Sequence, residues 1–183
     1  MAEKVYAKEP VTPEELAHYG SHVIQYSGEY SFCAGCDSCM IMCGLSHEGT
    51  AGHGNGRIQV DHGTRSLVNH ILSCQQCHDH PCYNACPRKD AAMCLDPDTS
   101  IAYVNEENCI GCGLCARACK FQPSRIVMKK DRSRKLWKAA KCDLCRGTPE
   151  GPQCIRWCPV QCLGLSENAA ADENGEFFPR QNG

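Results

Sequence analysis

Short apolar runs alternate with polar, glycine-rich and proline-rich stretches along this chain of 183 residues. The pattern predicts short strands at residues 57–60 and 100–104, and a hairpin with strands at 125–130 and 135–139. A short helix is expected from about Cys43. Together these elements indicate an α+β fold of short strands and helices.

The N-terminal residues 1–31 form an extension with one predicted helix. Thr12 has the features of an N-cap, with Pro13 at the first helical position and Glu15 closing a capping box. Gly20 is a suitable stop. A helix this short cannot bury its own apolar face, so we expect it to pack on the rest of the protein or on a partner.

Eighteen cysteines change this picture, because sixteen of them fall into four groups of four. The first and third groups share the spacing C-x2-C-x2-C-x3-C, the second is C-x2-C-x4-C-x3-C, and the fourth is C-x2-C-x8-C-x3-C. In chain order the groups are Cys33, Cys36, Cys39 and Cys43; Cys74, Cys77, Cys82 and Cys86; Cys109, Cys112, Cys115 and Cys119; and Cys142, Cys145, Cys154 and Cys158.

The spacing of the first and third groups is the ligand pattern of bacterial iron–sulfur ferredoxins. Three cysteines on one tightly curled loop can reach three different irons of a [4Fe–4S] cube, but the loop cannot also wrap its far side. In two-cluster ferredoxins the fourth cysteine of each run therefore binds the other cluster. Pro87 and Pro159 follow the last cysteines of groups two and four, and turn the chain away after the ligand. The groups predict four [4Fe–4S] clusters, or three if one group is idle, and a protein that transfers electrons.

Zinc and disulfides are the alternatives. Zinc sites commonly combine two C-x2-C pairs across a longer spacer, whereas each C-x2-C pair here is followed by a C-x3-C pair. A disulfide framework would suit a short secreted protein, but the first ten residues are polar and mixed in charge, unlike a signal sequence. Both alternatives are less favoured than iron–sulfur clusters.

The nested order of the groups suggests two bacterial-ferredoxin-like modules, one inserted in the other, within a domain at 32–165. Groups two and three form the inner module (74–119), groups one and four the outer module (32–73 and 120–165), and the polar residues 166–183 an extended tail. Exchange of the fourth cysteines then predicts four ligand sets: Cys33, Cys36 and Cys39 with Cys158; Cys142, Cys145 and Cys154 with Cys43; Cys74, Cys77 and Cys82 with Cys119; and Cys109, Cys112 and Cys115 with Cys86.

Several residues lie outside this scheme. Cys94 and Cys162 are expected to be small buried residues, although Cys162 continues the x3 spacing after Cys158. Four histidines near the ligands could tune cluster potentials by hydrogen bonding: His47, His70, His78 and His80.

The predicted hairpin region is strongly basic, with seven Lys and Arg between Lys129 and Lys141 against one Asp. A solvated hairpin is the first interpretation. The others are a docking face for an acidic partner and a positive field that stabilises reduced clusters.

Composition limits the fold and the partners. The apolar fraction of 42% includes the eighteen cysteines, and the chain has 2 Trp, 6 Tyr and 4 Phe. Because metal sites commonly supply folding free energy, we expect the chain to be largely unfolded without iron and sulfide. No apolar run is long enough for a transmembrane segment, and a net charge of −2 argues against a nucleic-acid partner.

With these motifs the chain resembles the four-cluster ferredoxin subunits that accompany molybdenum and tungsten oxidoreductases, over about residues 30–165 and including the long gap in group four. The segment Cys43-Gly-Leu-Ser-His47-Glu-Gly49, followed by Arg57-Ile58-Gln-Val60, is more similar to small subunits associated with tungsten enzymes of the aldehyde:ferredoxin oxidoreductase family, which include tungsten benzoyl-CoA reductase. The N-terminal extension departs from the family's usual start close to the first cysteine.

The resemblance implies a large tungsten- or molybdenum-pterin catalytic partner and allows further electron-transfer subunits. The leading hypothesis is a non-catalytic subunit that relays single electrons between the partner's cofactor and an external donor or acceptor. The alternative is a freely diffusing polyferredoxin. Every group has four cysteines, so no iron is left open for catalysis. The first residues show no twin-arginine leader, which favours the cytoplasm.

Overall fold

The computed structural model describes most of the region that contains the cysteine groups. Side chains and backbone are described for residues 22–25, 33–63, 68–77, 79–131 and 136–165, and the backbone alone for 169–171 and 177–179. The predicted helix at Thr12 and the side chain of His78 lie outside these residues. None of the described helices is long and apolar enough to cross a membrane.

The helices coincide with the cysteine groups. In groups two, three and four the third cysteine lies in a four-residue helix: α3 (Pro81–Asn84), α4 (Leu114–Arg117) and α5 (Gln153–Arg156). Group one differs, because α2 (Ser38–Glu48) has eleven residues and carries two cysteines. The η1 turn (His53–Asn55) follows α2.

The start predicted for the helix near Cys43 is wrong: α2 begins five residues earlier, at Ser38. Asp37 has a left-handed backbone (φ 58°), which ends the preceding loop and lets α2 begin at Ser38. Gly49 ends it with φ 66°, and its N–H donates to the carbonyl of Leu45. Left-handed glycine is the common helix stop, and this end of the helix agrees with the start of the predicted glycine-rich loop.

The strands form two-stranded antiparallel pairs. The predicted hairpin is confirmed as β6 (Ile126–Lys130) with β7 (Trp137–Lys141). The other predicted strands are shifted by two residues at their start: β2 (Gln59–His62) pairs with β3 (Asn69–Leu72), and β5 (Ala102–Val104) pairs with β4 (Met93–Leu95).

Two further pairs involve the ends of the chain. Strand β1 (Val23–Gln25), in the N-terminal extension, pairs with β8 (Leu163–Leu165) just after the last cysteine group. In the predicted tail, β9 (Ala169–Ala171) pairs with β10 (Phe177–Pro179). Part of the N-terminal extension is therefore attached to the cysteine-rich region by a strand pair.

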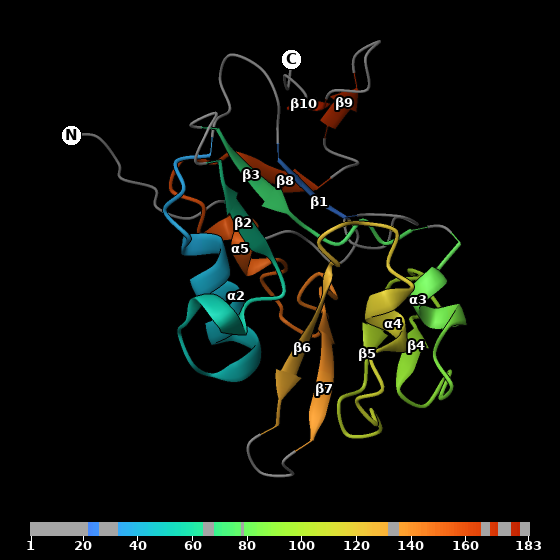
Figure 1. Cartoon of the computed structure of the whole chain (residues 1–183). Coiled ribbons are helices and arrows are strands. Elements are labelled where there is room, and N and C mark those ends of the chain that lie inside the picture. The colour runs from blue at the N-terminus through green and yellow to red at the C-terminus, as the bar shows by residue number, and fades with distance from the viewer. Residues whose placement is uncertain are drawn as a thin grey trace, which may run out of the picture.

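The apolar core is divided in two. In what we call the α2–α5 half, helices α2 and α5 pack together over buried residues that include Val23, Ile58, Leu144 and Leu163. In the α3–α4 half, α3 packs on α4 around Met93, Ile126 and Ala139, which come from β4, β6 and β7. The hairpin β6–β7 runs between the two helix pairs (Figure 1).

Candidate metal centres

The loops that carry the cysteines bend sharply beside the second cysteine of each group. A residue with a left-handed backbone lies directly before it in each case: Gly35 (φ 65°), Gln76 (φ 43°), Gly111 (φ 73°) and Leu144 (φ 57°). At Gly111 a Cβ atom would lie 2.0 Å from the backbone oxygen of Trp137, so glycine is required there. These bends aim the thiols of one loop at a common point.

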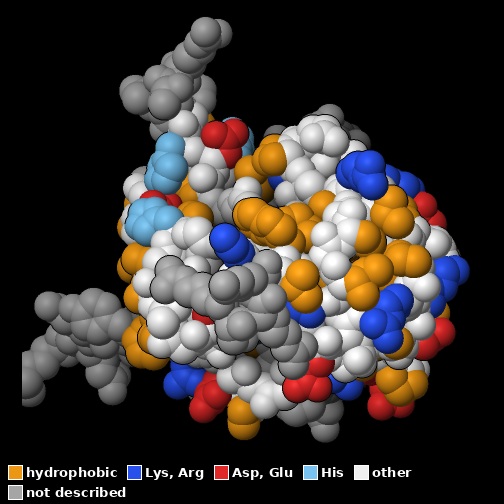
Figure 2. Space-filling view, turned by 60° about the horizontal axis from the view of Figure 1, so that its bottom comes forward, with side chains coloured by type: hydrophobic (Ala, Val, Ile, Leu, Met, Phe, Trp, Pro, Cys, Tyr) orange, Lys and Arg blue, Asp and Glu red, His pale blue; other side chains and the backbone are white. Residues whose placement is uncertain are grey.

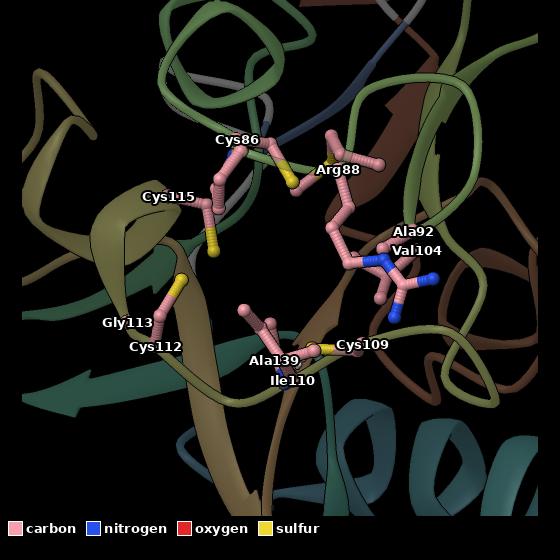
Figure 3. A pocket seen from close by; sticks show the side chains of 12 residues that line it. Cys86, Arg88, Ala92, Val104, Cys109, Ile110, Cys112, Gly113, Cys115 and Ala139 are labelled. Carbon is pink, nitrogen blue, oxygen red and sulfur yellow. Dashed lines mark hydrogen bonds between the residues drawn. The ribbon is translucent and has the colours of Figure 1, made fainter.

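Four thiols line one pocket in the α3–α4 half, which we name the Cys109 site. Cys109, Cys112 and Cys115 come from group three and Cys86 from group two. Their sulfur atoms surround a shared space, and Ala139 of β7 lies beside Cys109, across that space from Cys86 (Figure 3). The pocket also contains Met93, Val104 and Ile110, so its walls are mostly apolar.

The reciprocal arrangement forms the Cys74 site. Cys74, Cys77 and Cys82 of group two line a second pocket together with Cys119 of group three. The two pockets are similar in size, at about 360 and 370 Å³. The packing of α3 on α4 brings the two groups together.

A third pocket, the Cys33 site, lies in the α2–α5 half. Cys33, Cys36 and Cys39 of group one line it with Cys158 of group four, and Cys162 lines it as well. Its volume is about 270 Å³. The structure thus brings together the cysteines that the sequence paired, and adds a fifth.

The remaining four cysteines gather in the same half, at the Cys142 site. Cys43 and Cys154 are both buried in the core of the α2–α5 half, and Cys142 packs against that core. Burial raises the pKa of Cys145 to about 12, and the neighbouring charge of Cys43 contributes to the rise. Burial and then neighbouring cysteines, Cys43 among them, also raise the pKa values of Cys142 and Cys154. The ring of His47 contacts both Cys43 and Asp143, which follows Cys142 in the chain, so Cys43 lies beside the first cysteines of group four.

The donor set suits [4Fe–4S] cubes. All eighteen cysteines are free thiols, and among the described residues no three Cys, His, Asp or Glu side chains converge closely enough to hold a single metal ion. Ligands of a cube bind different irons and must be spread around it. Backbone N–H groups donate to at least one sulfur of each site: Gly35 to Cys33 (3.4 Å), Arg57 to Cys43 (3.2 Å), Arg125 to Cys119 (3.4 Å), Ala139 to Cys109 (3.5 Å) and Gln153 to Cys145 (3.5 Å).

Buried thiols resist ionisation, which links iron binding to proton release. Burial raises the pKa of Cys39 to about 12 and that of Cys115 to about 11. Iron–sulfur clusters bind thiolates, so the protons of these thiols must leave when iron binds. The same burial keeps water away from the bound ligands.

A charged network supports the Cys142 site. The Arg57 side chain, 10% exposed, donates to Asp143 (3.0 Å) and Glu106 (3.0 Å), while its backbone N–H donates to Cys43. The ring of His47 contacts Asp143 at 2.9 Å and the sulfur of Cys43 at 3.8 Å. Burial is the largest single influence and lowers the pKa of His47. The hydrogen bonds to Asp143 and Cys43 and the charge of Asp143 together outweigh burial and raise this pKa to about 10.

Ionisation of Cys43 shows the effect of this network. Burial raises its pKa, but the hydrogen bonds from His47 and from the Arg57 N–H lower it more, and the net shift is downward. The prediction that His47 hydrogen-bonds near a ligand is therefore confirmed. His80 lines the Cys74 site, whereas His70 is exposed on β3.

A buried lysine joins the two halves. Lys141, only 2% exposed, donates to the side-chain oxygen of Gln76 (2.8 Å) and to the carbonyl of Ala102 (2.7 Å). Gln76 in turn donates to the carbonyl of Cys142 (2.9 Å). Lys141 also lines the Cys74 site. It places a positive charge between the Cys74 and Cys142 sites.

Some lysine side chains of the basic hairpin are buried in the protein. The interpretation that the hairpin is basic because it is solvated does not account for them. Besides Lys141, Lys138 is buried and donates to the carbonyl of Cys109. Lys129 pairs with Glu48 of α2. Of the four cations of this region that the structure describes, these three bind protein groups, and Lys141 and Lys138 lie beside predicted ligands.

The two odd cysteines, Cys94 and Cys162, which belong to none of the four groups, have different surroundings. Both are buried, as predicted. Cys94 lies in β4, where its thiol donates to the carbonyl of Asp90 (3.3 Å). Cys162 instead lies 3.7 Å from Cys158, sulfur to sulfur. Its hydrogen bond lowers the pKa of Cys158 to about 6.

Sequence reasoning did not identify Gln76 or Asp143. It named Arg57 only within a segment that resembles a family, and Lys141 only as one end of the basic hairpin region. Lys141 and Asp143 flank the ligand Cys142, and a charged residue beside a buried cysteine is a signal that could have drawn attention to them. Gln76 and Arg57 have no comparable signal, because their partners lie far away in the chain.

Comparison with known proteins agrees with this chemistry. Residues 102–122 match the family model described as a 4Fe-4S binding domain. The "Aliphatic sulfonate oxidoreductase, polyferredoxin-like subunit" of Pyrococcus furiosus is 38% identical over 126 residues, which are 69% of this chain and 66% of that subunit. The "Electron transport protein HydN" of Escherichia coli is 31% identical over 150 residues, covering 73% of this chain and 82% of its own length.

A solved structure, the active site complex BamBC of benzoyl coenzyme A reductase as isolated, aligns with 80% of this chain and 78% of that chain, at a TM-score of 0.40 and 19% identity. The sequence relatives are iron–sulfur electron-transport and polyferredoxin-like proteins, and one of them matches over most of both chains. The chain therefore belongs to this family of polyferredoxin-like 4Fe–4S electron-transport proteins.

Proposed function

We propose that this chain holds four [4Fe–4S] clusters in two nested modules and is the electron-transfer subunit of a larger oxidoreductase. The proposal rests on three pockets, each lined by the first three cysteines of one group and the last cysteine of another, as the predicted exchange requires. The α3–α4 half corresponds to the inner module and the α2–α5 half to the outer one. The hairpin β6–β7 is shared, because Ile126 and Ala139 pack in the inner core.

Bound clusters would supply reversible one-electron chemistry. Contacts between the sites support an order for them. Cys39 and Cys154 lie in the same apolar core, Gln76 before Cys77 donates to the carbonyl of Cys142 (2.9 Å), and α3 packs on α4. This supports a linear sequence: the Cys33 site, the Cys142 site, the Cys74 site and the Cys109 site.

The ends of this sequence lie at the surface. Among the sixteen predicted ligands, Cys36 of the Cys33 site and Cys112 of the Cys109 site are exposed. Apolar side chains surround the second of these ends, with Ile110 52% exposed and Trp137 53% exposed. Figure 2 shows hydrophobic side chains gathered on one face among Lys and Arg. Exposed apolar surface beside a terminal site supports docking of a protein partner there.

The proposed partner is a large tungsten- or molybdenum-pterin catalytic subunit, with an external electron donor or acceptor at the other end. The support is the resemblance of the cysteine groups and the description of the Pyrococcus furiosus relative as a subunit of an oxidoreductase. We place the protein in the cytoplasm, because the proposed clusters need cysteines that stay reduced, and thiols persist in reducing compartments.

The test is anaerobic purification of the native protein from its source, followed by metal analysis. The expected result is co-purification with a large subunit that contains tungsten or molybdenum, and about sixteen irons in this chain, four for each cube. A monomer with the full iron content would favour the freely diffusing polyferredoxin. About twelve irons would mean that one group is idle.

A further inference from the structure

The Cys33 site contains one thiol more than a cube requires. Five cysteines line its pocket: Cys33, Cys36, Cys39, Cys158 and Cys162. Cys162 is 1% exposed, and its sulfur lies 3.7 Å from that of Cys158. The pockets of the Cys74 and Cys109 sites are each lined by four cysteines.

A tight turn holds the fifth thiol in place. The N–H of Gln161 donates to the carbonyl of Cys158 (3.1 Å), and Gln161 itself has a left-handed backbone (φ 52°). Strand β8 begins at Leu163 and pairs with β1. Cys162 is therefore fixed between this turn and a strand, beside Cys158, rather than on a freely moving loop.

The corresponding positions of the other groups carry no sulfur. Four residues after the last cysteine, groups one, two and three have His47, Asp90 and Pro123. Cys94, the other odd cysteine, is absent from the residues that line the described pockets, and its thiol is directed to a backbone carbonyl. The fifth thiol distinguishes the Cys33 site from the Cys74 and Cys109 sites.

We propose that Cys162 is an alternative iron ligand of the Cys33 site and exchanges with Cys158. This inference rests on the proposed function, because it requires an iron–sulfur cluster at that site. In the exchange the bond from iron to the Cys158 sulfur breaks and a bond from the same iron to the Cys162 sulfur forms. The Cys162 thiol proton passes to the Cys158 sulfur, so charge and oxidation state are unchanged.

The position of the site explains the use of a second thiol. Cys36 of this site is exposed, so this end of the protein meets solvent and oxidants. A site whose fourth ligand can come from either of two adjacent buried thiols retains its cluster when one of them is oxidised or displaced.

The test compares ligand variants of the full-length protein, purified anaerobically. Cys158→Ala is expected to keep the wild-type iron content, because Cys162 replaces the lost ligand. The double variant Cys158→Ala/Cys162→Ala should lose about a quarter of the iron, one cube of four. Cys119→Ala is the matched control, because the Cys74 pocket has no fifth thiol, and it should also lose about a quarter.

Cys162→Ala should retain all its iron, because Cys158 remains the ligand. In Cys158→Ala the iron content should also be retained, but the electron paramagnetic resonance signal of one cluster should change, because its ligand is now Cys162. Variants that accumulate poorly are reconstituted in vitro with iron and sulfide, with circular dichroism as a check of folding. Loss of a quarter of the iron in Cys158→Ala would overturn the proposal, and so would loss in Cys162→Ala alone. If the wild-type protein itself holds fewer than four clusters, that result contradicts the proposed function and is distinct from a failure of the ligand exchange.

Discussion

The two halves of the molecule use the same cysteine chemistry but are supported differently. Among the described residues, and apart from cysteines, the buried core of the α2–α5 half has eight residues and that of the α3–α4 half has three. The α2–α5 half has an eleven-residue helix, whereas α3 and α4 have four residues each. The α2–α5 half is stabilised largely by packing of apolar side chains, while the α3–α4 half has little apolar core besides its cysteines.

The hydrogen bonds to sulfur differ in the same way. Backbone N–H groups donate to sulfurs in both halves. In the α2–α5 half, side chains contact the predicted ligands as well: His47 contacts Cys43, and Cys162 contacts Cys158. A similar ligand spacing therefore does not imply a similar environment, and cluster potentials depend on such hydrogen bonds.

Removal of iron should give the largest effect and should expose this difference. After treatment with acid and a chelator, we expect most of the chain to unfold, because metal binding supplies folding free energy. Amide hydrogen exchange should rise most in residues 74–119 and least in β1, β8 and α2, where the apolar core is larger. Equal exchange in both halves would show that the extra packing of the α2–α5 half does not support it independently.

Substitution of Gly111 should break one site of the α3–α4 half. In Gly111→Ala the new methyl group meets the backbone oxygen of Trp137, which lies 2.0 Å from the Cβ position. The loop must move, so we expect loss of the Cys109 cluster and about a quarter of the iron. Gly113→Ala is the control: it has a similar φ of 72° but no atom within 4 Å of the Cβ position. It should keep its iron and lose about 1 kcal/mol of stability. Iron analysis and anaerobic denaturation measure the two effects.

Arg57 provides the corresponding test in the α2–α5 half. Arg57→Met removes the cation that neutralises Asp143 and Glu106. Asp143 stays largely buried and keeps His47 and the backbone N–H of Cys145 as partners. Breaking a buried pair in this way should cost about 3 kcal/mol of unfolding free energy.

The control for Arg57 is Arg146, which pairs with Asp96 at 2.7 Å but is 45% exposed at its side chain. Arg146→Met should cost about 1 kcal/mol or less, because solvent screens that pair. Both costs are measured by denaturant unfolding of the cluster-loaded proteins. A similar cost for the two variants would contradict the assignment of Arg57 to a buried network.

The smallest expected effect concerns the junction between the halves. Lys141→Met keeps the length of the buried stem but removes the positive charge beside the Cys74 and Cys142 sites. Reduction adds negative charge, so loss of a nearby cation should lower the midpoint potential of at least one middle cluster. Redox titration followed by electron paramagnetic resonance measures this shift. Lys130→Met, at the exposed end of β6, should leave the potentials unchanged.

The elements that could be predicted from sequence are those with local causes. The hairpin β6–β7 was found within two residues, because its two apolar strands flank a polar turn. The end of α2 follows from Gly49, but its start depends on the left-handed backbone at Asp37, for which aspartate is only a weak signal. The pairing of β1 with β8 was missed because its strands are separated by about 140 residues of chain.

The sequence by itself determined the chemistry of this protein: sixteen cysteines in four groups, two of which have the ferredoxin spacing, define the predicted donor sets, and the nesting of the groups predicts which cysteines lie together. These are properties of short loops, which the bonding needs of a cube constrain. Only the tertiary structure placed Lys141 between two sites, Arg57 on the Cys142 site and Cys162 in a pocket with four other thiols. Such neighbours depend on how distant segments pack, and no local pattern in the chain encodes that packing.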